Sequence, residues 1–570
     1  MKKILIILVA IFSIAFASAQ SLLAYLPADS VAVFGLQDLA QHEDKLSQFI
    51  DEYNRLGLND SLAKLNGAEQ DSKDSKSFGI MKSNPFKNLD AMDFLGQEAW
   101  FALSASKFNP IPATTIILRL SPKAVKPVFT SLEKESKAEG VEKLAEGKYS
   151  FYQSKIESED SPVQNVSYAL IDDVVIFSSD TDVMRSILRQ MAGSSDPNFM
   201  ASEGYGNSLA QLGNANFYSY VDYGAIASLV KPFTKGLGFD DLVNRLEKAF
   251  NTAGISAYVA NITADGIEGS SLQALNPNAG DSELYALLSS NVAAKQDIRF
   301  PDGALSLSSS HVDLKGWWSY LNELTSSVPD IGMSLDEMAA MFLNVDLSDS
   351  LFSWTGDQLI TVTTGVADVA MPGVASANLL GEQVYIISTT DSKKTSQKLS
   401  SLIESLATSV SSFADPEGGS GTVLEPTTQE ISGVTVTSYE ITDGVNVNYA
   451  ITDDLVFFGS TNEAITKVLS AGSNSDIDSL LKQIPSNATT FSVANLKSTM
   501  QGTAAQIGSQ IQMAAGLSGS NNLDFDAVDE SSAKMEEFVK FIADRLNYSI
   551  SYSQVENGQI RGHSKLDVAW

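Results

Sequence analysis

Cysteine is absent from this chain of 570 residues. Its absence excludes disulfide bonds, thiolate metal sites, cysteine nucleophiles and the lipidated cysteine of a bacterial lipoprotein. Hydrophobic residues make up 44% of the chain and charged residues 19%, the composition of a globular protein rather than a disordered one. Hydrophobic cores must therefore hold the fold, and the chain is long enough for two large domains.

Histidine is scarce, because the chain has only His42, His311 and His563. None of them has a second histidine two to five residues away, so we expect ordinary surface or boundary residues and no histidine-rich metal site. A Ser-His-Asp triad stays open, since its members need not be neighbours in sequence. No G-x-S-x-G elbow, Walker loop or dinucleotide-binding fingerprint occurs. The sequence thus predicts no catalytic, cofactor-binding or metal-binding residue.

Basic residues are few compared with acidic ones, 38 against 69, which gives a formal net charge of −31. Without the first segment and its Lys2 and Lys3, 36 basic and 69 acidic residues give −33. Such a surface repels nucleic acid phosphates and anionic lipid headgroups. It favours solubility and cations or basic partners, and the plain alternative is a solvated acidic surface without a specific role.

Long apolar runs are missing, apart from a short one near the start of the chain. Residues 1–19 have the pattern of a secretory signal peptide, with Lys2-Lys3, an apolar run of 13 residues at 4–16, and the cleavage site Ala17-Ser18-Ala19. That run is short for a bilayer span, and a retained anchor is the alternative. We expect an exported protein that is periplasmic, outer-membrane-associated or extracellular and has no transmembrane span.

One short pattern occurs twice. Residues 168–179 and 449–460 each contain an apolar run, an Asp-Asp pair and a second apolar run, which is typical of a β-hairpin. Apolar residues at helical spacing follow each copy and predict a buried helix face. These residues are Met184, Ile187 and Leu188 after the first copy, and Ile465, Val468 and Leu469 after the second.

Other segments recur in the same order around the two hairpins. Strands are predicted at 31–34, 99–103, 114–120 and 149–153, and again at 304–307, 359–362, 384–388 and 434–439. We therefore predict a tandem duplication, with a signal peptide at 1–19, a first repeat domain at 20–280 and a second at 281–570. We expect a mobile connection or loose helix at 57–88, and an inserted flexible loop at 413–430.

The predicted strands come in hairpins with helices between them, without the strict alternation of a parallel sheet. This order predicts an α+β fold of two homologous domains, each a largely antiparallel sheet with helices packed on one face. Each half should close with a hairpin, and its turn is Asp265-Gly266 or Asn557-Gly558, pairs that favour a type I′ turn. Trp317 and Trp318 have the spacing of core residues on a helix.

Paired carboxylates invite a catalytic or Ca²⁺-binding interpretation. Adjacent strand residues point to opposite faces, so Asp172-Asp173 and Asp453-Asp454 cannot readily share one ion, and we interpret both pairs as turn residues. Residues 521–526 alternate acidic side chains but lack the glycine and terminal glutamate of an EF-hand loop. Neither segment is therefore predicted as a metal site.

Three motifs together resemble a family of exported bacterial proteins that is classed only as a domain of unknown function, of the 3352 type. They are the Leu26-Pro27-Ala28-Asp29 opening, the approach to a strand at 89–98, and the Asp-Asp hairpin followed by a helix. The resemblance covers both halves, although the second has Pro301-Asp302-Gly303 where the first has Pro-Ala-Asp. It implies the fold and export, and it supplies no catalytic residue.

Export and repetition without a catalytic signature lead to one main hypothesis, a non-enzymatic envelope protein that binds or scaffolds another envelope component. The first alternative is a periplasmic carrier of a lipid or another apolar ligand, which a helix-covered sheet could enclose. The second is a hydrolase with a dispersed site, which would need a polar pocket with a histidine or paired carboxylates. The expected partner is an unknown envelope protein or apolar ligand, with no nucleic acid and no cofactor.

Overall fold

The computed structural model describes most of the chain. It describes residues 21–58, 91–105, 112–138, 140–155, 165–234, 240–295, 300–326, 332–365, 382–414, 425–442, 445–472, 475–502, 504 and 525–570. The predicted signal peptide at 1–19, most of the connection predicted at 57–88 and the acidic positions 521–524 lie outside these residues.

Strands occupy both halves of the described chain. Those of the first half are β1 (Ser30–Gln37), β2 (Glu98–Ser104), β3 (Ala113–Arg119), β4 (Val141–Glu146), β5 (Tyr149–Lys155), β6 (Asn165–Ile171), β7 (Val174–Ser178), β8 (Phe217–Asp222), β9 (Ile255–Ile262) and β10 (Gly266–Ala274). Those of the second half are β11 (Ser306–His311), β12 (Thr355–Gly365), β13 (Glu382–Thr389), β14 (Thr427–Ile431), β15 (Val434–Thr442), β16 (Val445–Ile451), β17 (Leu455–Gly459), β18 (Thr490–Asn495), β19 (Leu546–Glu556) and β20 (Gln559–Val568).

Helices lie between the strands. The α-helices are α2 (Glu43–Arg55), α4 (Ala91–Leu95), α5 (Pro122–Glu135), α6 (Thr181–Met191), α7 (Glu203–Gly206), α8 (Leu209–Leu212), α9 (Tyr223–Thr234), α10 (Asp240–Ala253), α11 (Ser282–Leu288), α12 (Leu314–Ser326), α13 (Leu335–Leu343), α14 (Ser392–Ala414), α15 (Asn462–Leu469), α16 (Ser475–Leu481) and α18 (Phe525–Ala543). The short 3₁₀ helices are η1 (Leu22–Tyr25), η2 (Leu39–His42) and η3 (Phe199–Ala201), and η4 (Ser348–Phe352) is a π-helix.

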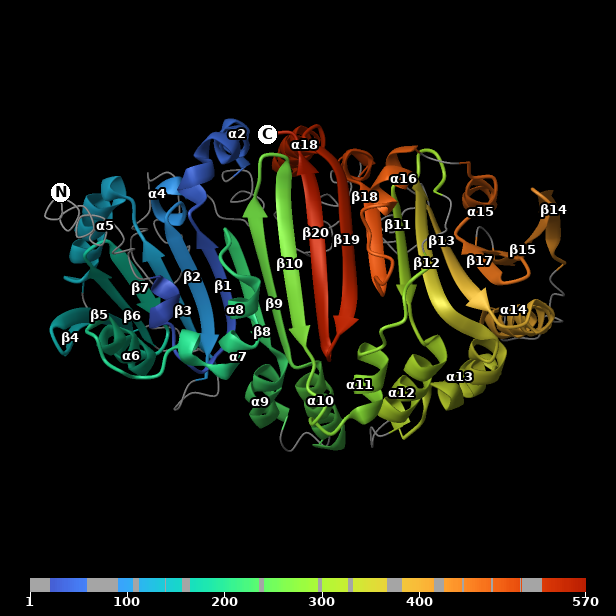
Figure 1. Cartoon of the computed structure of the whole chain (residues 1–570), viewed down its shortest axis with the longest axis horizontal. Helices are drawn as coiled ribbons and strands as arrows, with labels where there is room; N and C mark the ends of the chain where they lie inside the picture. The colour runs from blue at the N-terminus through green and yellow to red at the C-terminus, as the bar shows by residue number, and fades with distance from the viewer. Residues whose placement is uncertain are drawn as a thin grey trace, which may run out of the picture.

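The described strands form one antiparallel sheet of 20 strands (Figure 1). Its first half has the spatial order β4-β5-β6-β7-β3-β2-β1-β8-β9-β10. The sheet continues from β10 as β20-β19-β18-β11-β12-β13-β17-β16-β15-β14. The second half therefore has the strand order of the first, read outward from the centre.

Hydrophobic cores lie on both faces at each end of the sheet. Val174 and Ile176 of β7 point to a core that includes Met184, Ile187 and Leu188 of α6, all three fully buried. Val175, between them in sequence, points to the opposite face and packs with α5. The second half repeats this arrangement, because α15 packs into one core and α14 into the other. The alternation of strand side chains accounts for both cores.

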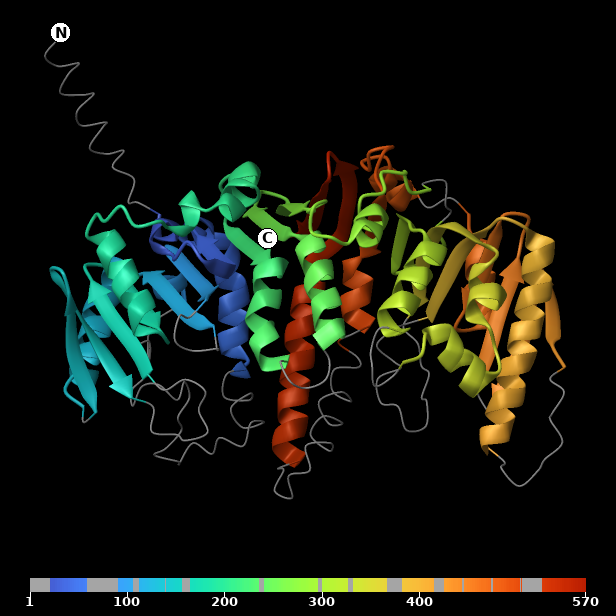
Figure 2. The ribbon, with the colours of Figure 1, turned by 90° about the horizontal axis from the view of Figure 1, so that it is seen from below.

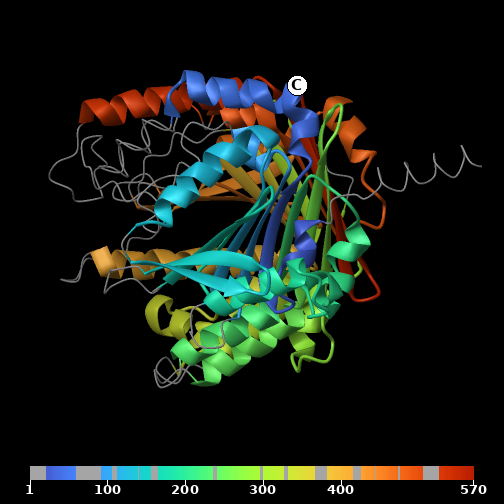
Figure 3. The ribbon, with the colours of Figure 1, turned by 90° about the vertical axis from the view of Figure 1, so that its left-hand side faces the viewer.

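The two halves meet along β10 and β20, which pair from Gly266 opposite Asp567 to Ala274 opposite Gln559. Helices reinforce the junction at both edges of the sheet (Figures 2 and 3). At one edge α2 of the first half packs on α18 of the second, where Phe49 meets Phe541 edge to face at 5.7 Å between ring centroids. At the other edge Arg245 of α10 pairs with Glu323 of α12 at 3.0 Å.

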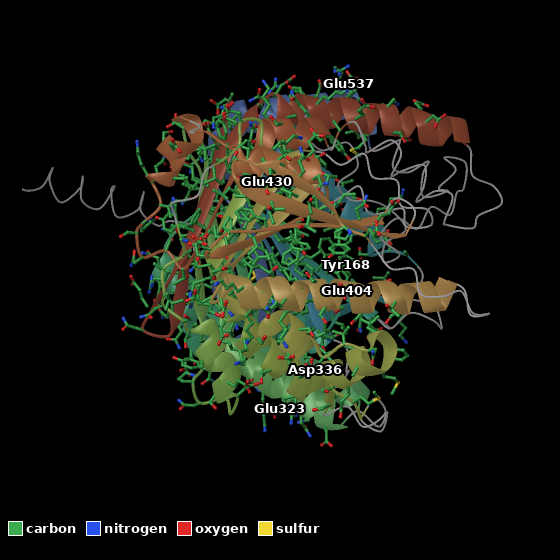
Figure 4. All side chains as sticks on the ribbon, turned by 90° about the vertical axis from the view of Figure 1, so that its right-hand side faces the viewer. Tyr168, Glu323, Asp336, Glu404, Glu430 and Glu537 are labelled. Carbon is green, nitrogen blue, oxygen red and sulfur yellow. The ribbon has the colours of Figure 1, made fainter. Side chains whose placement is uncertain are left out.

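The two edges carry related ion pairs with the same polarity. Arg55 of α2 pairs with Glu537 of α18, so the first half supplies the cation there. At the opposite edge Arg245 of the first half is again the cation and Glu323 of the second half the anion. Glu537 and Glu323 lie at opposite edges of the molecule in Figure 4.

The α+β class and the antiparallel sheet are confirmed, as are both Asp-Asp hairpins and the helices after them. The repeated strand order is what a duplicated chain would produce, while duplication as its origin stays a prediction. The predicted boundary between 280 and 281 falls between β10 and α11, and the hydrogen-bonded sheet crosses it through β10 and β20.

Three local predictions were wrong. Part of the loop expected at 413–430 is strand β14, paired with β15. The turn at Asp265-Gly266 is not type I′, because only Gly266 has a positive φ, whereas both Asn557 and Gly558 do. Trp317 and Trp318 are half-buried instead of core residues, since Trp318 stacks on Phe352 and donates to Asp336 at 3.2 Å.

Candidate functional site

The larger of the two cavities that stand out among the described residues has a volume of about 820 Å³ and lies at one edge of the sheet. We call it the edge cavity. It is formed where β1 begins, β8 and β10 end, and α7, α9 and α10 approach them, at the lower edge in Figure 1. Six elements thus contribute to one hollow.

Tyr220 of β8 forms part of the wall of the edge cavity. Alternation along β8 turns Tyr218 and Tyr220 to the core face, where Tyr220 packs edge to face on Phe199 and is only 2% exposed. Its hydroxyl lies against Gly204, another lining residue, and a Cβ at that glycine would overlap it. Among the described residues this hydroxyl has no hydrogen-bond partner, so it is left to bond to whatever occupies the cavity.

Asp222 lies two residues further along, at the end of β8 and the start of α9. Its Oδ1 accepts a hydrogen bond from the backbone N–H of Ala225 at 2.9 Å, the arrangement of a helix N-cap. Burial, together with the nearby Asp222 carboxylate, raises the pKa of Tyr220 above its usual range. The Tyr220 hydroxyl therefore stays protonated at neutral pH and can both donate and accept a hydrogen bond.

Two glycines let the backbone close around the cavity. Gly254 follows α10 with a φ of +68°, and a Cβ there would overlap the carbonyl oxygen of Ala274. A Cβ at Gly224 would overlap Oδ1 of Asn251, so the amide of Asn251 lies directly over the first turn of α9. Only glycine permits these close approaches of α9, α10 and β10.

The described lining of the edge cavity is acidic. Asp29, Glu203 and Asp222 contribute carboxylates from three separate segments, and no lysine, arginine or histidine is among the lining residues that the structure describes. A smaller cavity of about 240 Å³ shares Asp29 with it and contains Arg189. That guanidinium is engaged by Asp196 at 3.0 Å and Glu146 at 3.4 Å, and these partners raise its pKa.

The three histidines lie in different elements and none lines either cavity. His42 ends η2, His311 ends β11 with Nδ1 3.4 Å from Asp357, and His563 of β20 packs on the ring of Tyr552. Within the described ranges no group of three or more histidine, aspartate or glutamate side chains could hold a metal ion.

Both Asp-Asp pairs lie in turns, as predicted. Asp172 is exposed with a φ of +54°, and Asp173 pairs with Arg119 at 3.3 Å. Asp454 similarly pairs with Lys295 at 3.4 Å. The turn interpretation is confirmed, since Asp172-Asp173 connect the paired strands β6 and β7, and Asp453-Asp454 lie between β16 and β17. Residues 521–524, on which the Ca²⁺ interpretation rested, lie outside the described residues.

Sequence reasoning did not single out Tyr220, Glu203 or Asn251. Tyr220 alternates with Tyr218 along a strand, the pattern of any half-buried strand, so no local signal marks its hydroxyl as unpartnered. Glu203 and Asn251 come from helices separated by almost 50 positions, and only the folded chain brings them together. The sequence does place glycine at 204, 224 and 254 and asparagine at 251, residue types that allow close approach of the backbone, but it does not show that these positions come together.

Among the helices that the structure describes, none is both long enough and apolar enough to cross a membrane. No curated protein and no solved structure matches the chain. A family model described as "Protein of unknown function (DUF3352)" matches residues 92–504, which is more than half of the chain. The matched region includes Tyr220, Asp222 and the helices around the edge cavity. The chain therefore belongs to the DUF3352 family of proteins of unknown function.

Proposed function

We propose that the protein is exported and acts as a non-enzymatic binding protein of the cell envelope, with the edge cavity as its binding site. The observation that carries this proposal is Tyr220, whose ring is packed in the core while the residue lines an open cavity of about 820 Å³, and whose hydroxyl has no side-chain or backbone partner among the described residues. A protonated phenol that is held in place by its ring packing and has no partner in the protein can form a hydrogen bond with a bound ligand.

The lining favours a ligand with polar groups over the purely apolar one considered from sequence. Carboxylates, the amides of Asn207 and Asn251, and hydroxyls share the described wall with apolar side chains such as Leu229 and Ile255. An acyl chain placed there would desolvate these groups without replacing their hydrogen bonds, which is unfavourable. The lipid-carrier alternative therefore gains no support from this site.

A hydrolase remains the second candidate, because several carboxylates line the cavity and such a function would need two of them. Asp29, Glu203 and Asp222 come from different segments, as the acid and base of a glycosidase do. Turnover of an envelope-derived substrate by the purified protein, abolished by Asp222→Asn, would favour this candidate over binding.

Native mass spectrometry tests the binding function directly. The purified mature chain is incubated with a detergent-free bacterial envelope extract, reisolated and weighed, and we expect a reproducible bound mass. The double variant Ala225→Trp with Ser228→Trp places two indoles in the cavity from one face of α9 and should reduce the bound fraction at least ten-fold.

The matched control is Lys393→Trp with Ser396→Trp, which places two indoles at the same spacing on exposed positions of α14. This variant should retain the bound mass. A bare mass for the wild-type chain, or equal loss in both variants, would contradict the proposal that the edge cavity binds a ligand.

A further inference from the structure

The edge cavity selects for one sign of charge. Its carboxylates come from the segment before β1, from α7 and from the end of β8. No lysine, arginine or histidine is among the described residues that line the edge cavity with Glu203 and Asp222, and the whole chain carries a net charge of −31. An anionic ligand would be repelled both at long range and inside the cavity.

Tyr220 adds a hydrogen-bonding requirement to this charge. Its hydroxyl is held by the packing of its ring on Phe199 and by Gly204, so it cannot turn away to find a partner within the protein. Asp222, on the same strand, is close enough to influence its ionisation. A ligand that satisfies both groups must donate hydrogen bonds, since a carboxylate only accepts them, and a positive charge on the donor strengthens its hydrogen bond to the carboxylate.

A divalent metal ion is a poor fit, because no group of three or more potential ligand side chains comes together among the described residues. A quaternary ammonium is also a poor fit, since it cannot donate to the phenol oxygen or to a carboxylate. A primary ammonium is compact, positive and has three N–H donors, which suits one phenol oxygen and nearby carboxylates.

We propose that the edge cavity binds an amine-bearing small molecule, with its primary ammonium held between the Tyr220 hydroxyl and the Asp222 carboxylate. This inference rests on the proposed binding function and specifies its ligand class. Glu203, which also lines the cavity, would contribute longer-range attraction, and a cavity of about 820 Å³ accommodates an aliphatic polyamine or an amino sugar.

Two substitutions separate the hydrogen bond from the charge. Tyr220→Phe removes only the unpartnered hydroxyl and leaves the ring packing and every charge in place. Asp222→Asn removes the charge but keeps an oxygen that can cap α9, and asparagine is as good an N-cap as aspartate. Glu133→Gln on the exposed face of α5 removes one surface charge away from the cavity and is the control.

The experiment is isothermal titration calorimetry of the full mature chain with spermidine at 150 mM salt, which screens diffuse attraction to the acidic surface. We expect saturable binding that Tyr220→Phe and Asp222→Asn each weaken about ten-fold or more, the usual effect of losing a hydrogen bond to a charged group. Glu133→Gln should bind like the wild type. Tetramethylammonium, which has the charge without the donors, should bind at least ten-fold more weakly than spermidine.

The outcomes are distinguishable from failure of the proposed function. Spermidine binding that is unchanged in both cavity variants would overturn the inference, because the amine would then bind elsewhere on the acidic surface. Glucose binding that depends on Tyr220 would show a binding cavity with a neutral ligand and would overturn the ammonium class alone. If spermidine does not bind but the envelope extract leaves a bound mass, the ammonium class is likewise overturned and the binding function is retained. If neither spermidine nor an envelope component binds, both the ligand class and the binding function are overturned.

Discussion

Glu98, the first residue of β2, is a charged side chain in the core with only 5% of its surface exposed. Its Oε1 accepts three hydrogen bonds, from Ser21 Oγ at 2.6 Å, the Leu22 N–H at 2.7 Å and Trp100 Nε1 at 2.8 Å. Arg119 completes the arrangement with an ion pair to Oε2 at 3.5 Å. A buried carboxylate is tolerated because each oxygen is engaged, and here it fastens η1 to the sheet.

Glu98→Ala should lower the free energy of unfolding by about 3–5 kcal/mol, because it leaves three donors without their acceptor and removes one of the carboxylates that Arg119 contacts. Glu98→Gln retains an oxygen for the three hydrogen bonds and loses the ion pair, so we expect a smaller loss of about 1–2 kcal/mol. Urea denaturation followed by tryptophan fluorescence measures both. Glu133→Gln, an exposed partner of Lys137, is the control and should change stability by less than about 0.5 kcal/mol. Equal stability of Glu98→Ala and wild type would contradict the role assigned to this residue.

Single residues mark the limit of prediction from this sequence. The apolar residues of β7 and α6 were identified as core from spacing alone, and Met184, Ile187 and Leu188 are indeed fully buried. Glu98 could not be identified as a buried acceptor, because its hydrogen-bond donors include residues from a distant part of the chain. Tyr220 could not be identified either, because its proposed role depends on the lack of a partner for its hydroxyl in the folded chain. Periodicity indicates which face a side chain occupies and says nothing about what meets it there.

The two Asp-Asp hairpins are the elements that the sequence predicted best. Both form at the expected positions, yet their turns differ in backbone conformation. Asp172 has a φ of +54°, in the left-handed region, while Asp453 is absent from the positive-φ residues of the described chain. Similar sequences thus conceal a conformational difference, because aspartate tolerates both regions.

This difference predicts unequal responses to the same substitution. Asp172→Val places a β-branched residue in the left-handed region and should destabilise the protein by about 1–2 kcal/mol, whereas Asp172→Gly should be close to neutral. Asp453→Val, at the corresponding exposed position of the second hairpin, is the matched control and should cost less than about 0.5 kcal/mol. Thermal denaturation of the three variants provides the measurement. Equal losses in the two valine variants would mean that turn polarity, and not φ, sets the cost.

Other elements escaped prediction for identifiable reasons. Strand β14 has four exposed residues and one buried residue, so it lacks the apolar alternation by which strands are recognised. It lies at the end of the sheet, where polar residues are expected because one edge stays unpaired by the described strands. At Asp265-Gly266, Thr263 N–H donates to the Gly266 carbonyl at 2.8 Å, so the turn encloses residues 264–265 and lies one residue earlier than the dipeptide predicted.

At the scale of the whole molecule, the unexpected feature is that both halves share one sheet. The repeated motifs predicted two similar units, but period-two alternation does not reveal which strand ends pair across units. The two halves join where β10 pairs with β20, a junction that we call the seam. At the seam, Gly269 of β10 faces Ser564 of β20, and Gly562 of β20 faces Ser271 of β10. A Cβ on either glycine would lie against the opposing serine, 2.6 Å from Ser564 Oγ in the case of Gly269. A glycine opposite a serine thus occurs twice where β10 and β20 pair, and in both places it lets the two strands approach closely.

This seam should couple the unfolding of the two halves. Because β10 and β20 are hydrogen-bonded along their whole length, we expect the wild-type chain to unfold in one calorimetric transition. Gly562→Val forces a branched side chain against Ser271 Oγ and should weaken the seam by about 1–3 kcal/mol, as overpacking generally does. Differential scanning calorimetry should then show a lower first midpoint and a second transition from the half that remains folded.

The control for this prediction is Gly472→Val, since a Cβ at Gly472 meets no atom within 4 Å. It should leave one transition at the wild-type temperature. Two transitions already present in the wild type would contradict the prediction. They would mean that the β10–β20 pairing and the edge contacts of α2 with α18 and of α10 with α12 are together too weak to couple the unfolding of the two halves. A single transition in Gly562→Val, shifted but not split, would instead mean that those helix contacts couple the halves even when the seam is strained.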